Sequence, residues 1–182
     1  MADRLASDGE TVSLRDGGVK AAVVIDVGCA RYGGDYSIER LIEEFTPDVL
    51  YGFDPGWDSS QVERIGSTVL NVTKAAAWTC DGEIDFVVAG LSGHVASETE
   101  RQTVCVPCVD LATVVEDAHR EHGGPLVLKI DAEGAEYDLL AHLIATGRDR
   151  LVDLAWVEWH KPDRGRADLE ELFAGEVIEW RW

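Results

Sequence analysis

Hydrophobic residues along this chain form short continuous runs that alternate with stretches of helical spacing. Apolar runs at 23–27, 49–53 and 126–130 have the length of buried strands, and each leads into a carboxylate or a glycine. Between the first two runs, residues 37–45 repeat apolar side chains at the spacing of a helix face. This alternation predicts an α/β fold with an open, mostly parallel sheet and helices on both faces.

The remaining pattern extends the same arrangement over one domain, 1–182, with residues 1–18 as a polar N-terminal arm. Asp110 is a candidate N-cap for one of the further helices. Strands are predicted at 67–72, 84–89 and 151–159, helices at 110–122, 135–144 and 167–173, a weak helix at 61–65, and a loop at 90–97.

The turn after the first apolar run carries the first candidate chemistry. Asp26 lies near the end of the run, and glycines from Gly28 to Gly33 would let the backbone approach a ligand. The second run ends at Asp54, which is placed to accept hydrogen bonds from ribose hydroxyls. The turn does not contain G-x-G-x-x-G, which argues against an NAD-binding oxidoreductase.

A later segment, 126–140, contains Lys-Ile-Asp-Ala-Glu-Gly-Ala-Glu and resembles the motif of FkbM-type S-adenosylmethionine-dependent methyltransferases. Segments 76–86, 106–111 and 157–160 are similar to other parts of that family. The resemblance implies a Rossmann-like class I methyltransferase fold. That fold usually has two strands at its C-terminal end, whereas this sequence ends with residues 177–182, so we expect a shortened C-terminal end.

The resemblance also implies a cofactor, S-adenosyl-L-methionine. The first turn would contact its amino-acid part, Asp54 would hold the ribose, and the segment from Ala76 would flank the adenine, although Trp78 could equally be a core aromatic residue. The residues expected to bind the cofactor are Asp26, Gly28, Cys29, Tyr32, Gly33, Asp54, Pro55, Ala76, Ala77, Trp78 and Asp131.

Polar residues at the ends of the fourth and fifth predicted parallel strands are the catalytic candidates: Asp131, Glu158 and His160. We expect a neutral His160 to act as the general base, with an exposed histidine of no catalytic role as the alternative. Lys129 could form a buried ion pair with Glu158. A divalent metal held by Asp131 and Glu158 is conceivable, but the sequence offers no evident third ligand, so no metal is assigned.

The amino-acid composition limits the kinds of molecule that the protein is expected to bind and the compartment in which it is expected to work. Sixteen basic and thirty-five acidic residues give a net charge of −19, which opposes the approach of nucleic acid. The sequence lacks a run long enough to span a membrane and an apolar signal peptide, so we expect a cytoplasmic protein with its four cysteines reduced. Cys105 and Cys108 have metal-ligand spacing but no second pair to complete a zinc site.

The function expected from these observations is O-methylation of a hydroxyl on a small molecule, a sugar or a glycoconjugate. The alternative is a non-catalytic module of the same fold that binds S-adenosylmethionine or a partner protein. The sequence leaves the oligomeric state and the acceptor open.

Overall fold

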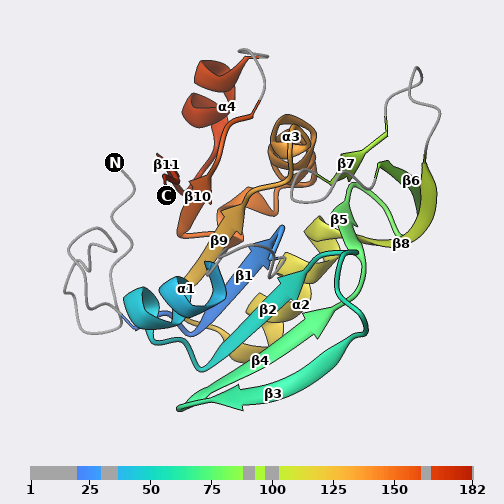
Figure 1. Cartoon of the computed structure of the whole chain (residues 1–182). Helices are drawn as coiled ribbons and strands as arrows, with labels where there is room; N and C mark the ends of the chain where they lie inside the picture. Colours follow the sequence, from blue (N-terminus) through green and yellow to red (C-terminus); the bar gives the residue numbers. More distant parts are fainter. Residues whose placement is uncertain (1–19, 30–36, 88–92, 97–102, 161–164, 182) are drawn as a thin grey trace.

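The computed structural model describes residues 20–29, 37–87, 93–96, 103–160 and 165–181. They form a mixed α/β structure with two sheets (Figure 1). The predicted arm 1–18, residues 90–92 and 97 of the predicted loop 90–97, and the candidates Tyr32 and Gly33 lie outside the described residues.

The main sheet has seven strands, and its neighbours run parallel to one another except at one edge. At its centre, Val23 of β1 lies opposite Val49 of β2 on one side and Leu126 of β9 on the other. The strand order is β11 (Glu176–Glu179), β10 (Leu154–Val157), β9 (Leu126–Ile130), β1 (Val23–Val27), β2 (Val49–Phe53), β4 (Thr68–Thr73) and β3 (Gln61–Ile65).

The edge strand β3 corrects one expectation, because residues 61–65 are extended and not weakly helical. β3 pairs antiparallel with β4 through a tight turn at Gly66, whose φ of 59° is in the left-handed region. Val62 is 68% exposed, so this strand has no buried face of its own. An edge strand without an apolar face gives no period-2 hydrophobic signal.

Helices cover both faces of the main sheet, as predicted. On one face α1 (Ser37–Phe45) shares a buried cluster with side chains of β1, β2 and β4. On the other face α2 (Leu111–His122) and α3 (Glu136–Thr146) pack against β1, β9 and β10. Residues 151–159 were predicted as one strand, but Leu151 is the last residue of a 3₁₀ turn, η1 (Asp149–Leu151). The strand itself, β10, covers only Leu154–Val157 and is shorter than expected. A short helix, α4 (Arg166–Leu172), precedes β11.

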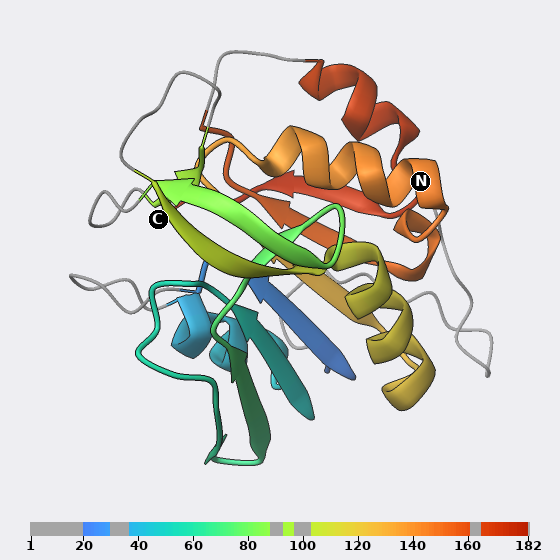
Figure 2. The same ribbon diagram turned by 90° about the vertical axis from the view of Figure 1, so that its right-hand side faces the viewer.

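The second sheet is mainly antiparallel and was not predicted as a separate sheet. β8 pairs parallel with β5 and antiparallel with β6, and β6 pairs antiparallel with β7. Figure 2 shows this sheet in green in front of the main one. Its strands, in order, are β5 (Ala76–Trp78), β8 (Val104–Asp110), β6 (Gly82–Val87) and β7 (His94–Val95).

A mostly parallel arrangement therefore describes the main sheet but not the second one. Within the described part of the chain, no helix is both long enough and apolar enough to cross a bilayer.

Candidate active site

The candidate site lies at the carboxyl ends of three adjacent parallel strands, β1, β9 and β10. The sheet pairing continues past the strands, because Asp131 N donates to Val27 O at 3.0 Å and Glu158 N donates to Ile130 O at 2.9 Å. Residues that follow β9 and β10 are thereby held side by side. In open parallel sheets this edge is where ligands bind.

Gly28 brings the turn after β1 against the end of β9. Its φ is 79°, and a Cβ atom built there would lie 1.8 Å from the backbone oxygen of Asp131. A larger residue would thus face both a disfavoured backbone conformation and an overlap with another strand. Gly28 is needed for this close approach, whether or not a ligand binds the turn.

Lys129 lies beneath the turn and is fully buried. Its Nζ lies 3.1 Å from Asp26 Oδ1 and 3.3 Å from Asp131 Oδ2, and it donates to Gly28 O at 3.0 Å. Ser37 Oγ of α1 donates to Asp26 Oδ2 at 2.8 Å. Burial raises the pKa of the Asp26 carboxyl, and Lys129 and Ser37 oppose that rise.

The ion pair that the sequence allowed between Lys129 and Glu158 is not the one that Lys129 forms, because its ion-pair partners are Asp26 and Asp131. Lys129 is level with Trp156 on β10, and Asp26 is its direct partner on β1. Glu158 lies further along, near Asp131, and its side chain is 27% exposed. The alternation of side chains along each strand shows which residues share a face of the sheet. It does not show which of them are level with one another on neighbouring strands.

The turn between β9 and α3 is organised by Glu136, a residue that sequence reasoning did not select. Its side chain is fully buried, and Oε1 accepts hydrogen bonds from Ala132 N at 3.3 Å and Gly134 N at 2.9 Å. Glu133 within this turn has a φ of 51°, which is uncommon for a residue with a side chain. The signal that could have drawn attention to Glu136 is its place as the last residue of the Lys-Ile-Asp-Ala-Glu-Gly-Ala-Glu motif, although the motif does not show which side chain it meets.

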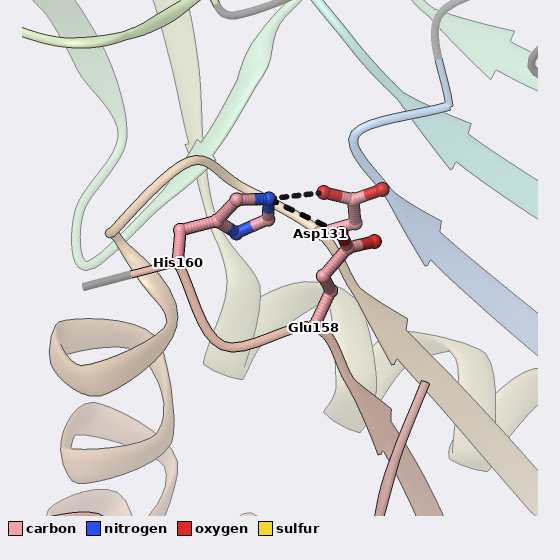
Figure 3. A group of neighbouring side chains, drawn as sticks. All are labelled: Asp131, Glu158 and His160. Carbon is pink, nitrogen blue, oxygen red and sulfur yellow. Dashed lines mark ion pairs between the residues drawn. The ribbon is translucent and has the colours of Figure 1, made fainter. Parts of the chain in front are cut away.

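His160 is held by Glu136 and faces two other carboxylates. Its Nδ1 lies 2.7 Å from Glu136 Oε1. Its Nε2 lies 3.4 Å from Asp131 Oδ1 and 3.6 Å from Glu158 Oε1, and Figure 3 shows all three side chains converging. Glu133 Oε2 is 3.9 Å from the same nitrogen. The three catalytic candidates are therefore brought together.

The charge of His160 differs from the expectation. Its hydrogen bond with Glu136, opposed by burial and reinforced by the charges of Glu133 and Asp131, raises the pKa of His160 to about 9. The imidazole is therefore protonated near neutral pH, which corrects the expectation of a neutral base. The sequence could not reveal this, because Glu136 is distant along the chain from His160.

The second predicted contact region follows β2. Asp54 Oδ1 accepts from Gly56 N at 2.6 Å and so closes a tight turn that includes Pro55. Trp57, which sequence reasoning did not select, donates from Nε1 to Cys29 O at 3.2 Å. Cys29 itself is buried, and burial raises the pKa of its thiol well above the usual value. Trp57 therefore contacts Cys29 through its backbone oxygen, and it also lies within hydrogen-bond reach of the thiol.

The segment of Ala76, Ala77 and Trp78 is β5 of the second sheet. Ala76 and Ala77 are buried, and Ala77 belongs to the same core cluster as Val27 and Phe53 at the ends of β1 and β2. Trp78 is half-buried and packs against that cluster, which agrees with its interpretation as a core aromatic residue. The segment therefore lies near the other predicted contact regions.

The chain is thus an α/β protein with a polar site at the carboxyl edge of its parallel strands. The site combines the glycine turn at Gly28, the buried Lys129 and the acids around His160. The chain matches the methyltransferase FkbM domain over residues 58–178, and it belongs to that family. The match includes Asp131, Glu158 and His160, whereas the first turn and Asp54 precede it. Neither the search of curated proteins nor the search of solved structures found a match to the chain.

Proposed function

We propose that this protein is an S-adenosylmethionine-dependent methyltransferase of Rossmann-like class I type, acting on a hydroxyl of a small molecule, a sugar or a glycoconjugate. Its membership of the FkbM methyltransferase family supports the reaction class. The observation that carries the proposal is the convergence of Asp131, Glu158 and His160 beside the turn that begins at Gly28.

In this proposal the cofactor lies along the ends of β1, β2 and β5. Backbone groups around Gly28 and Cys29 would contact the amino-acid part, and Asp54 with Pro55 would contact the ribose. Ala76, Ala77 and Trp78 would border the adenine, and Asp26 would act through Lys129 and Ser37 to keep the turn in place. The Cys29 thiol has no chemical role here, because methyl transfer needs none.

Methyl transfer is an in-line displacement at a sulfonium carbon, so the protein chiefly supplies orientation. A hydroxyl acceptor must also lose its proton. Asp131 and Glu158 offer carboxylate oxygens at the strand ends, and His160 offers a polar nitrogen between them. These three groups are proposed to hold the acceptor oxygen. A carboxylate, Asp131 or Glu158, is proposed to receive the proton, because His160 is already protonated near neutral pH.

Binding and catalysis can be tested separately. Calorimetry should detect S-adenosylmethionine binding and little NAD binding, and Asp54→Ala should weaken the former by about 1–3 kcal/mol because hydrogen bonds to a charged group are lost. Asp48→Ala is the matched control, since Asp48 is an exposed acid paired with Lys20. Equal affinities for the two variants would show that the ribose site is misplaced.

Transfer of a labelled methyl group to a library of hydroxylated compounds tests the activity. Transfer to a hydroxyl supports the proposal, and Asp131→Asn should reduce it. Tight cofactor binding without transfer to any acceptor would favour the alternative, a non-catalytic binding module.

A further inference from the structure

One feature of the site has the geometry of a coordination sphere. Asp131, Glu158 and His160 each offer one ligand atom, and these three atoms lie within 4.8 Å of one another. The nitrogen to oxygen distances from His160 are 3.4 and 3.6 Å. Ligands about 2.1 Å from one metal ion are about 3 to 4.2 Å from each other, so small side-chain movements would suffice to bind one.

The orientation of His160 is a second observation, independent of those distances. Glu136, fully buried, holds Nδ1 at 2.7 Å and thereby turns Nε2 toward the two carboxylates. A carboxylate on the far nitrogen is the usual support of a metal-binding histidine, because it fixes the ring and increases its donor strength. Glu136 is itself fixed by the backbone of the turn at Ala132 and Gly134.

The charges around the site also favour a cation. Five carboxylates lie around two basic groups, Lys129 and His160; the acids are Asp26, Asp131, Glu133, Glu136 and Glu158. Lys129 faces Asp26 and the Oδ2 atom of Asp131, which leaves Oδ1 turned toward His160. The sulfonium of the proposed cofactor is cationic too, but it has no coordination position for an imidazole nitrogen.

We propose that Asp131, Glu158 and His160 bind one divalent transition-metal ion, with Glu133 close enough to contribute a further oxygen. One imidazole with two or three carboxylates suits Mn²⁺ or Zn²⁺ better than Mg²⁺ or Ca²⁺, which prefer oxygen ligands throughout. The role of the ion in catalysis rests on the proposed methyl transfer: a bound cation would hold the acceptor hydroxyl and ease loss of its proton to a neighbouring carboxylate. Metal binding itself does not depend on that function.

The test uses the full chain after treatment with EDTA. Mn²⁺ is added at 150 mM NaCl with a large excess of Mg²⁺, and free Mn²⁺ is measured by electron paramagnetic resonance. We expect one tightly bound Mn²⁺ per chain, because weak binding by the many surface acids is suppressed by Mg²⁺. Glu158→Gln and His160→Gln should each weaken binding about 10-fold or more.

Matched controls are Glu121→Gln and His119→Gln, which change an acid and a histidine on α2, away from the site. Both should bind Mn²⁺ as the unaltered protein does. Melting temperatures and cofactor affinity of every variant show whether a loss of binding comes from unfolding.

Several results would overturn the metal site: no stoichiometric Mn²⁺, full displacement by Mg²⁺, or equal affinity in His160→Gln and His119→Gln. If methyl transfer persists in EDTA alongside any of these results, the metal-site proposal is rejected and the proposed methyltransferase activity stands. Stoichiometric Mn²⁺ without any methyl transfer would keep the metal site and reject the activity.

Discussion

Lys129 is the residue on which the buried part of the site depends. It is an ammonium group with no exposed surface, and its partners Asp26 and Asp131 come from β1 and from the end of β9. Charges are costly to bury unless they are paired. Removing Lys129 therefore does more than lose one attraction, because it leaves Asp26 without its counter-charge.

We expect Lys129→Met to lower the free energy of unfolding by about 3–5 kcal/mol, the usual cost of breaking a buried pair. Lys20→Met removes an ion pair to Asp48 that is 62% exposed on both sides and should cost about 0–1 kcal/mol. Urea denaturation measures both. Adding Asp26→Asn to Lys129→Met should recover part of the loss, and an unchanged stability in Lys129→Met would contradict this account.

Gly28 allows a second residue-level prediction. Gly28→Ala should destabilise the protein and weaken cofactor binding, because the new methyl group meets the Asp131 backbone. Gly66→Ala is the control: Gly66 also has a positive φ, but nothing lies within 4 Å of the position that a Cβ atom would take there. The difference between their melting temperatures isolates the overlap from the backbone strain, and similar values would mean that the turn can move away from β9.

Sequence reasoning identified Asp131, Glu158 and His160 because residues just after neighbouring parallel strands must meet at one edge. It did not find the partner of Lys129, since alternation gives the face of a strand but not the register between strands. It also missed the protonation of His160. That property depends on Glu136, whose position is set by the fold of the β9–α3 turn and not by any local pattern.

At the scale of elements, α2 begins with the cap that its sequence predicts. Asp110 Oδ1 accepts from Ala112 N at 2.8 Å and Thr113 N at 3.4 Å, and it lies 2.9 Å from His142 Nε2 on α3. The same carboxylate thus caps the first turn of α2 and joins α2 to α3. Asp110→Ala should lower stability by about 0.5–2 kcal/mol, which urea denaturation would measure.

This cap also predicts a dependence on pH. Burial would raise the pKa of Asp110, but the hydrogen bonds from His142, Ala112 and Thr113 prevail and lower it. The folded state therefore binds this proton less readily than the unfolded chain, so the contribution is present above the ordinary aspartate pKa of about 4 and is lost as pH falls through the folded value. Acid unfolding of Asp110→Asn should show a shallower slope there than that of Asp117→Asn, an exposed acid on the same helix.

The helices and strands that have a buried face were the ones that the sequence pattern predicted. β1, β2, β9 and the three longer helices follow the apolar pattern, and their expected ranges agree with the structure to within a few residues. β3 and the second sheet were not recognised as such. Their side chains are largely exposed or half-buried, so hydrogen bonds to neighbouring strands determine them more than hydrophobic periodicity does.

Across the whole molecule, a net charge of −19 means that acidic side chains repel one another over much of the surface. Salt at about 0.1 M screens exposed charges beyond about 10 Å, whereas buried pairs such as that of Lys129 are little affected. The melting temperature should therefore rise between low and moderate NaCl. Calorimetry with KCl as a second salt separates screening from binding of a particular ion, and a falling melting temperature would show that exposed ion pairs outweigh the repulsion.

The position of β1 in the main sheet has a consequence for how the protein folds. Val23 pairs with Val49 after one helix, but its other partner, Leu126, lies far along the chain beyond the whole second sheet. Pairings between such distant segments lose much chain entropy before they gain contacts, and they slow folding. The half containing β1, β2, β3 and β4 can pair locally, whereas the Gly28 to Asp131 contact requires β9. The edge that carries the candidate chemistry is therefore expected to form late in folding, when the two halves of the sheet join.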